Sequence, residues 1–339
     1  MTELLTDWQE FVSGQDIAPG PTTAEAGFFA ALTDFGIIAA TGDDAASFLH
    51  TQLTNDVETL GSGQARLAGY CTAKGRLLAT MLIWRTGDEI RLMLPRELLA
   101  PIQKRLQMFV LRAKVKLRDA SSEHAILGLA GSIDTAVLGA YLPGESNAPY
   151  SKQDSEDGEL GSLIRLPDAD GVPRSLWVAD IEQAMAAWTA LAGVLKPASP
   201  AAWRLTDIEA AIPWVVQATQ EKFVPQMINY ELIGGVNFKK GCYPGQEIVA
   251  RSQYLGKLKR RMLPARLSGA EAAAGMEVFS EKDPEQPCGM VVNAERGLDG
   301  DTACLVEIKI AEAGDAVIHL GSANGPALRF LPLPYAMPE

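Results

Sequence analysis

Residue types on which metal and redox sites commonly depend are scarce in this chain. The 339 residues include only 4 cysteines and 3 histidines. The cysteines are far apart in the sequence: Cys71, Cys242, Cys288 and Cys304. They form no CxxC pair, which excludes a disulfide framework and a self-contained zinc or iron–sulfur site. The histidines are equally isolated, so we predict no metal site and assign them structural or solvated positions.

Long apolar segments and a basic leader sequence are also missing. The longest useful apolar run, Leu77 to Trp84, is too short to span a bilayer and lies between two arginines. The N-terminal sequence MTELLTDWQEF is acidic and amphipathic, unlike a secretory signal peptide. We therefore expect a cytoplasmic protein without membrane contact.

Common nucleotide-binding and hydrolase motifs do not occur. Gly256-Lys257-Leu258 lacks the upstream glycine and the Ser or Thr of a Walker A motif, and there is no GxSxG or HExxH. Hydrophobic and charged residues make up 47% and 21% of the chain, as in ordinary globular proteins. The net charge of −12 argues against a general nucleic-acid binder but permits a local basic site.

The most distinctive segment is Lys239 to Arg261, KKGCYPGQEIVARSQYLGKLKRR, in which Glu247 is the only acid. Its glycines and proline at 241–245 predict a turn, and residues 246–254 then form a helix. A turn before a helix N-terminus gathers N–H groups suited to an anion or a thiolate. Cys242 lies among cations, the setting that activates a thiol. The alternative is a buried cysteine in a glycine turn with a solvated basic helix.

Helix and strand patterns alternate through the first 255 residues. We expect two helices separated by a loop within residues 1–31, and a helix at 96–109. Strands are expected at 35–40, 69–74, 77–84, 90–94 and 125–130, with a hairpin at 163–178. Residues 111–118 alternate apolar and basic, which predicts a half-buried strand with a solvated basic face; the alternative is an anion or RNA contact. From residue 263 onward, short strands and turn signals predict an antiparallel β-barrel.

Several motifs resemble one family. KGCYPGQE at 240–247, followed by Ala250-Arg251, resembles the signature of the YgfZ family of folate-binding proteins, which are relatives of the aminomethyltransferase (T-protein) of glycine cleavage. FLHTQLTNDV at 48–57 and CTAKGRLLA at 71–79 are similar to the same proteins, so the resemblance covers most of the chain. Pro244 departs from the small or β-branched residue expected at its position.

This resemblance implies an α+β fold of three lobes around a folate-sized opening. Two α+β lobes would comprise residues 1–118 and 119–255 and would interleave. The C-terminal β-barrel would comprise residues 256–339.

The resemblance also implies a folate site, with tetrahydrofolate or a derivative as cofactor. WRLTDIEAAIP at 203–213 is similar to the segment that supplies folate contacts in relatives. Trp203 and Phe35 would be its aromatic walls, and Glu209 would accept a hydrogen bond from the pterin. Phe35 replaces the tryptophan expected there, which keeps stacking but loses an indole N–H donor.

The remaining site residues lie in the KGCYPGQE segment. Cys242 and Lys240 are assigned to catalysis. The side chains assigned to folate are Tyr243, Gln246, Glu247 and Arg251.

The function implied is a folate-binding accessory protein that supports iron–sulfur cluster assembly or repair and thereby tRNA modification. Its partners would be folate, iron–sulfur proteins or their assembly factors, and tRNA held weakly through segments 111–118 and 257–261. The alternative is an aminomethyltransferase, but T-proteins carry an acidic pair where this chain has Ala79 and Thr80. A pure RNA-binding module is a third interpretation, which the acidic net charge weakens.

Overall fold

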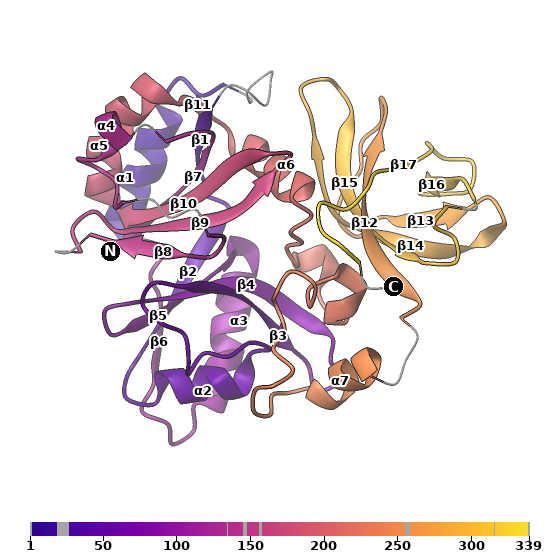
Figure 1. Ribbon diagram of the computed structural model, residues 1–339, viewed down its shortest axis with the longest axis horizontal. Coiled ribbons are helices and arrows are strands. Elements are labelled where there is room, and N and C mark those ends of the chain that lie inside the picture. The colour runs from indigo at the N-terminus through magenta and orange to yellow at the C-terminus, as the bar shows by residue number, and fades with distance from the viewer. Residues whose placement is uncertain are drawn as a thin grey trace. The chain divides into compact units, whose positions relative to one another are not determined.

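The computed structural model describes residues 2–18, 27–133, 135–144, 148–155, 158–254, 258–314 and 316–337 (Figure 1). The chain divides into two compact units. The first comprises Met1–Phe48, Glu58–Arg66 and Leu82–Trp203, and the second comprises Leu49–Val57, Leu67–Met81 and Arg204–Glu339. Each unit is therefore built from several separate stretches of sequence. The domain boundaries expected after residues 118 and 255 stay a prediction.

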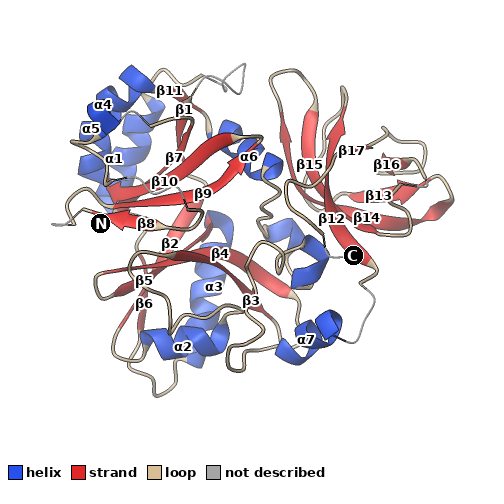
Figure 2. Cartoon of the chain, in the orientation of Figure 1, coloured by secondary structure: helices blue, strands red, loops and turns tan. Residues whose placement is uncertain are grey.

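Helices and strands occur in both units (Figure 2). The α-helices of the described ranges are α1 (Thr2–Ser13), α2 (Ala45–Gln52), α3 (Arg96–Phe109), α4 (Thr135–Leu138), α5 (Ile181–Val194), α6 (Pro200–Glu209) and α7 (Gln246–Tyr254). The bounds predicted for α3 and α7 are confirmed. None of the helices within these ranges is long and apolar enough to cross a membrane.

A six-stranded sheet forms the core of the first unit, in the order β11-β1-β7-β10-β9-β8. Its strands are β1 (Phe28–Ala31), β7 (His124–Ala130), β8 (Lys152–Asp154), β9 (Ser162–Ala169), β10 (Val172–Asp180) and β11 (Lys196–Ala198). Neighbours run antiparallel except β1 and β11, which are parallel. The predicted hairpin at 163–178 is confirmed as β9 and β10. A second helix was expected before residue 31. Residues 19–26 lie outside the described ranges, and Phe28–Ala31 forms strand β1, so the helix prediction is wrong for these four residues.

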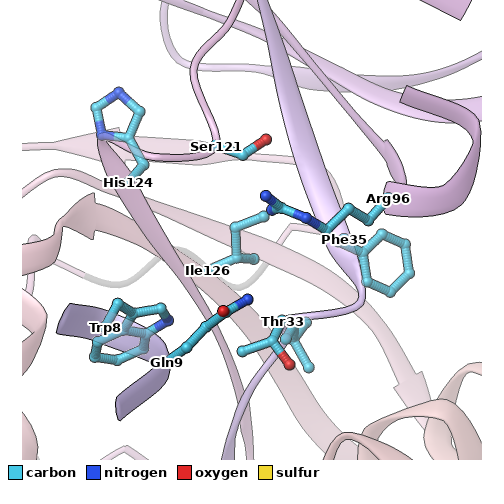
Figure 3. Close-up of a pocket in the computed structure, with 9 residues that line it drawn as sticks. Trp8, Gln9, Thr33, Phe35, Arg96, Ser121, His124 and Ile126 are labelled. Atoms are coloured by element: carbon cyan, nitrogen blue, oxygen red, sulfur yellow. The ribbon is translucent and has the colours of Figure 1, made fainter. Parts of the chain in front are cut away.

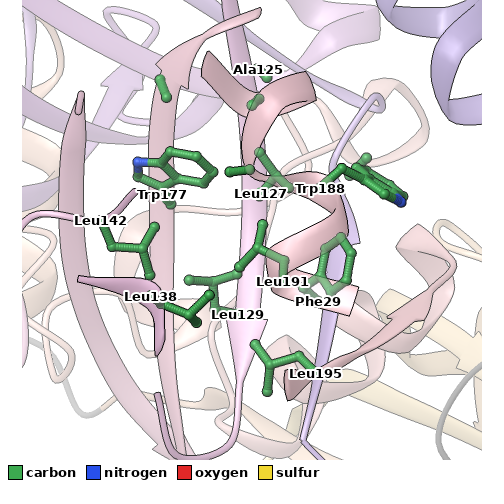
Figure 4. Close-up of a cluster of buried hydrophobic side chains, with 14 of the residues drawn as sticks. Phe29, Ala125, Leu127, Leu129, Leu138, Leu142, Trp177, Trp188, Leu191 and Leu195 are labelled. Atoms are coloured by element: carbon green, nitrogen blue, oxygen red, sulfur yellow. The ribbon is translucent and has the colours of Figure 1, made fainter. Parts of the chain in front are cut away.

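Helices α1, α4 and α5 contribute to the core beside this sheet (Figure 4). Every second residue of the central strands points into it, because side chains alternate between the faces of a strand. Trp188 of α5 lies edge-on to the rings of Phe29 and Trp8, with centroid distances of 4.8 and 6.0 Å. These rings and the aliphatic side chains around them stabilise this layer chiefly by removing apolar surface from water.

A five-stranded sheet has the order β3-β4-β5-β2-β6. Its strands are β2 (Phe35–Thr41), β3 (Ala65–Cys71), β4 (Leu77–Thr86), β5 (Glu89–Pro95) and β6 (Lys116–Asp119). Helix α3 packs on β2, β5 and β6. The strand expected at 111–118 is thus only partly correct. The chain leaves α3 in a turn with Leu111 at φ +43°, and pairing with β2 begins only at Lys116.

The C-terminal sheet lies in the second unit, in the order β16-β13-β14-β15-β12-β17. Its strands are β12 (Arg260–Leu267), β13 (Glu277–Ser280), β14 (Asp283–Arg296), β15 (Thr302–Lys309), β16 (Ile318–Leu320) and β17 (Arg329–Phe330). They are antiparallel and curled, but β16 and β17 remain the two edges. The expected barrel is therefore correct only in part: the sheet is antiparallel and curled like half a barrel, but it is not closed. Closure needs edge strands that pair along their length, and β17 has only two residues.

Candidate functional site

Two of the sequence motifs pack against each other in the second unit through their glycines. Gly245 of KGCYPGQE has φ +82°, and a Cβ there would lie 2.4 Å from the Thr72 carbonyl oxygen and 2.5 Å from the Gly75 nitrogen. Gly75 has φ +70°, and its Cβ would lie 3.1 Å from that of Ile248 in α7. Backbones approach this closely only where side chains are missing. The loop before α7 is therefore held against the turn between β3 and β4.

A third motif, FLHTQLTNDV, anchors the segment that leads into this loop. The Thr54 hydroxyl donates to the Gly235 carbonyl at 2.6 Å and accepts from the Gly69 amide at 2.7 Å. The buried side-chain amide of Asn55 donates to two backbone carbonyls, each at 2.7 Å. Asn237 donates its backbone N–H to the Thr54 carbonyl at 2.9 Å. Buried polar groups satisfied in this way fix the position of the backbone around them.

Lys240, assigned to catalysis from the sequence, is buried. Its ammonium group donates to the carbonyls of His50 and Leu53, the latter at 2.8 Å, where helix α2 ends. It also lies 4.9 Å from the centroid of the Tyr243 ring. The last carbonyls of a helix lack intrahelical partners, and a cation is favoured beside them. This geometry makes Lys240 a positioning residue that ties the loop to α2.

Cys242 lies at the exposed part of the same loop. The other three cysteines are buried, and burial raises the pKa of Cys71 and of Cys304 to about 12. A thiol reacts as its thiolate, so a buried thiol with a raised pKa is inert at neutral pH. Cys242 is thus the thiol most open to chemistry.

His50 was not singled out from the sequence, yet it lies beside this loop. Its Nδ1 is 3.1 Å from the Asp56 Oδ1, and a Cβ on Gly241 would lie 3.4 Å from its Nε2. An imidazole oriented by a carboxylate is a common proton acceptor next to a nucleophile. Only the fold brings His50 and Asp56 to the residue before Cys242, because they are far from it in the chain.

Tyr243 carries an unsatisfied polar group. Its side chain is 6% exposed, and its hydroxyl has no hydrogen-bond partner within the described part of the chain. Burial raises the pKa of this hydroxyl, so it stays protonated and able to donate. A buried hydroxyl without a partner is uncommon in proteins and is readily explained by a ligand or a water molecule.

The rest of the loop lies at or near the surface. Gln246 is half-buried, and Glu247 and Arg251 are exposed on α7. Their sequence-based assignment to folate stays a prediction.

Trp203, assigned to a folate wall, is buried in the first unit with 1% of its surface exposed. Its ring lies flat on Gly128 of β7, where a Cβ would be 2.3 Å from the ring. The guanidinium carbon of Arg174 lies 5.1 Å from the ring centroid. Sheet and arginine therefore cover the Trp203 ring.

Phe35, the other aromatic wall, lines a small pocket of the first unit with Trp8, Thr33, Arg96 and Ser121 (Figure 3). The pocket has a volume of about 10 Å³, enough for a single water molecule. A pterin ring does not fit this space.

Glu209 lies in the second unit, as do Ala79 and Thr80, which stand where T-proteins carry an acidic pair. Glu209, at the end of α6, has a carboxylate oxygen 3.5 Å from a guanidinium nitrogen of Arg266. Ala79 and Thr80 are buried. The Thr80 hydroxyl accepts from the Val215 amide at 2.9 Å and donates to the Pro213 carbonyl at 3.3 Å. Neither position offers an ionisable group for proton transfer.

Two of the four cations of the segment 257–261 are paired with carboxylates. Arg260 holds both carboxylate oxygens of Glu307, at 2.9 and 2.8 Å, and Arg261 is buried against Glu231. Lys259 is exposed, and Lys257 lies outside the described residues. Among the described residues, no cluster of three His, Cys, Asp or Glu side chains could hold a metal ion.

Proteins of known name are similar to the chain over most of its length. The tRNA-modifying protein YgfZ of Edwardsiella ictaluri is 30% identical over 311 residues, which cover 90% of this chain and 91% of that protein. The protein of the same name from Yersinia pestis strain Pestoides F is 28% identical over 310 residues, covering 91% and 92%. The crystal structure of the glycine cleavage system aminomethyltransferase T from Bartonella henselae matches with a TM-score of 0.74 at 18% identity, over 92% of this chain and 88% of that one. This likeness confirms the predicted T-protein-like fold. No protein-family model matches the chain.

Proposed function

The chain belongs to the family of the tRNA-modifying protein YgfZ, and on this basis we propose that it binds a folate and supports iron–sulfur cluster assembly or repair, and thereby tRNA modification. The observation that carries the proposal is the KGCYPGQE loop. It presents the exposed Cys242 next to the buried, unsatisfied hydroxyl of Tyr243. A loop anchored through Lys240, Gly245 and Thr54 suits a function that needs these two groups held in place.

Folate would be held by donors and cations of this loop. The Tyr243 hydroxyl can donate a hydrogen bond to a ring nitrogen or carbonyl of the pterin, and the Arg251 guanidinium can bind the carboxylate tail. The rings of Trp203 and Phe35 would stack on a pterin only if both were uncovered, so the proposal does not depend on them.

Cys242 would be the group that acts on a client protein. Its thiol is exposed, and the imidazole of His50, held by Asp56, lies beside the neighbouring Gly241 and can accept a proton. The loop thus exposes a thiol one residue away from a proton acceptor, and cysteine binds metals and reacts as its thiolate.

Aminomethyl transfer is the second candidate, favoured by the T-protein-like fold. The residues at the expected acidic pair, Ala79 and Thr80, are buried and cannot ionise. We therefore place this activity second and expect no methylenetetrahydrofolate from an aminomethyl-lipoyl carrier at T-protein rates.

Isothermal titration with tetrahydrofolate tests the folate proposal. We expect a dissociation constant in the micromolar range, which corresponds to about −8 kcal/mol. Tyr243→Phe removes only the hydroxyl and should weaken binding about tenfold, the effect of losing roughly 1.4 kcal/mol. The exposed Lys282→Gln serves as the control for Arg251→Gln. Absence of binding by the parent protein refutes the folate assignment, and equal binding by Tyr243→Phe and Arg251→Gln refutes the site.

Complementation tests the role of Cys242. In a cell that lacks its own family member, Cys242→Ser should fail to restore iron–sulfur enzyme activity although the protein is folded and binds folate. Lys239→Met, a change at an exposed neighbour in the same loop, should restore it fully. Full complementation by Cys242→Ser would make the thiol dispensable.

A further inference from the structure

An acid-free stretch of the first unit carries several cations. Between Glu97 and Asp119 there is no Asp or Glu, although the chain as a whole has a net charge of −12. The basic residues of this stretch are Lys104, Arg105, Arg112, Lys114, Lys116 and Arg118. It comprises most of helix α3, the turn after it and the first residues of β6.

Half of these cations are available to a partner. Lys114 pairs with Asp43 at 3.1 Å, and Arg118 pairs with Glu89 and Glu123. Arg105 is half-buried, and the remaining three cations, Lys104, Arg112 and Lys116, are exposed. Their side chains form no hydrogen bond or ion pair with any residue in the described ranges.

Apolar side chains are exposed between these cations. Met108, Phe109 and Leu111 are 60%, 45% and 87% exposed. Phe109 and Leu111 lie where α3 ends and the chain turns. Leu111 has φ +43°, a strained conformation for a residue with a branched side chain.

These residues define a basic–apolar tip: Lys104, Met108, Phe109, Leu111, Arg112 and Lys116. One open face of α3 continues from it and is formed by Ala100, Gln103, Lys104, Gln107 and Met108. The Gln107 amide is exposed there and can pair with a base edge or a ribose hydroxyl.

We propose that the basic–apolar tip is the surface through which this protein docks on a folded RNA, which for a member of this family is tRNA. The proposal rests on the proposed role in tRNA modification. Free cations and an exposed aromatic ring in one short stretch of chain are the combination that binds phosphates and stacks on an unpaired base. Lys104, Arg112 and Lys116 would bind phosphates, and Phe109 would stack.

Charge complementarity favours RNA as the occupant. The acidic remainder of the chain repels a polyanion, so binding confined to this tip would orient the tRNA on the protein. Three phosphate contacts predict a salt dependence of about 40-fold in affinity between 50 and 200 mM salt. An anionic membrane is the rival occupant, because Met108 and Leu111 could insert into lipid.

Fluorescence anisotropy with a labelled, unmodified tRNA transcript tests the proposal on the full-length protein. The charge variant is Lys104→Glu, Arg112→Glu and Lys116→Glu combined. A matched control reverses three exposed cations elsewhere: Lys196→Glu, Lys282→Glu and Arg329→Glu. We expect the charge variant to lose at least tenfold in affinity at 50 mM salt together with most of the salt dependence. The control has the same change in net charge, but its three cations lie outside the tip. It should therefore stay within about twofold of the parent protein.

A second variant separates stacking from charge. Phe109→Ala with Leu111→Ser should weaken tRNA binding several-fold and leave its salt dependence unchanged. Circular dichroism and folate titration show whether each variant is folded.

The outcomes discriminate between this proposal and the proposed function. If the parent protein does not bind the transcript, or if charge variant and control bind equally, the tip is not the RNA surface. Folate binding and complementation by Cys242 variants then still test the proposed function separately. Sedimentation with vesicles of 30% phosphatidylglycerol in phosphatidylethanolamine tests the rival. Tip-dependent vesicle binding without tRNA binding would overturn the proposal in favour of a membrane.

Discussion

Replacing Lys240 by methionine tests whether this residue anchors the loop. Methionine keeps the length and apolar character of the stem but removes the ammonium group. The carbonyls of His50 and Leu53 at the end of α2 would lose their donor. The cation above the Tyr243 ring would be lost as well.

The expected cost is a substantial part of the stability of the second unit. A hydrogen bond from a charged donor contributes about 1.5–3 kcal/mol. The contributions of the two bonds do not add fully, because water takes the place of the lost ammonium group on the loop side. The cation over the ring adds about 0.5–1 kcal/mol. We expect Lys240→Met to lower the free energy of unfolding by about 2–4 kcal/mol.

Urea unfolding followed by circular dichroism measures this cost. Lys239→Met is the matched control, because the side chain of Lys239 is exposed next in sequence, and it should change stability by less than about 0.5 kcal/mol. In native protein, Lys240→Met should also alter the alkylation rate of Cys242, since the loop loses its tie to α2. If the two variants unfold at the same urea concentration, the anchoring role assigned to Lys240 is wrong.

Three further predictions concern the loop and the two units. Gly245→Ala should destabilise the protein by more than about 3 kcal/mol, because its Cβ would overlap the Thr72–Arg76 backbone. Gly171 has a similar positive φ but lies in open space, so Gly171→Ala should cost only about 1 kcal/mol. Equal melting temperatures of the two variants would refute this contact. Burial lowers the folded-state pKa of His124 below 6.5, so the unfolded state takes up the proton first as the pH falls. The free energy of unfolding should therefore drop below pH 6.5, by up to about 1.4 kcal/mol per unit of pKa difference, and His124→Gln should lack this drop in urea titrations at pH 7.5, 6.5 and 5.5. Iodoacetamide at pH 7 should modify Cys242 before the three buried cysteines; peptide mapping that finds another cysteine first would contradict this.

Local structure was predictable because its causes are local. The apolar spacing of 96–109 and the glycine–proline turn before residue 246 predicted helices α3 and α7 with their observed bounds. Short apolar runs bounded by turn residues likewise predicted strands such as β2 and β4. Phe28–Ala31 was misassigned because an apolar run of four residues is too short to distinguish a strand from part of a helix.

The candidate site was only partly predictable. The sequence identified Cys242 and its glycine-rich loop, because residue type and spacing are visible there. It assigned Lys240 to chemistry, whereas the fold uses its charge against the end of α2. His50 and Asp56 were missed, because nothing in the sequence around them indicates that they lie beside Gly241.

The sequence by itself determined the family, the α+β class, the bounds of α3 and α7 and the exposed thiol of the loop, since these depend on residue type and short-range periodicity. Tertiary structure alone decided which charges are free and which rings are accessible. Arg174 and Gly128 cover Trp203, and Leu111 points into solvent at the end of α3. The exposure of a side chain depends on contacts with residues that are far away in the sequence. A local pattern of residues does not predict these contacts.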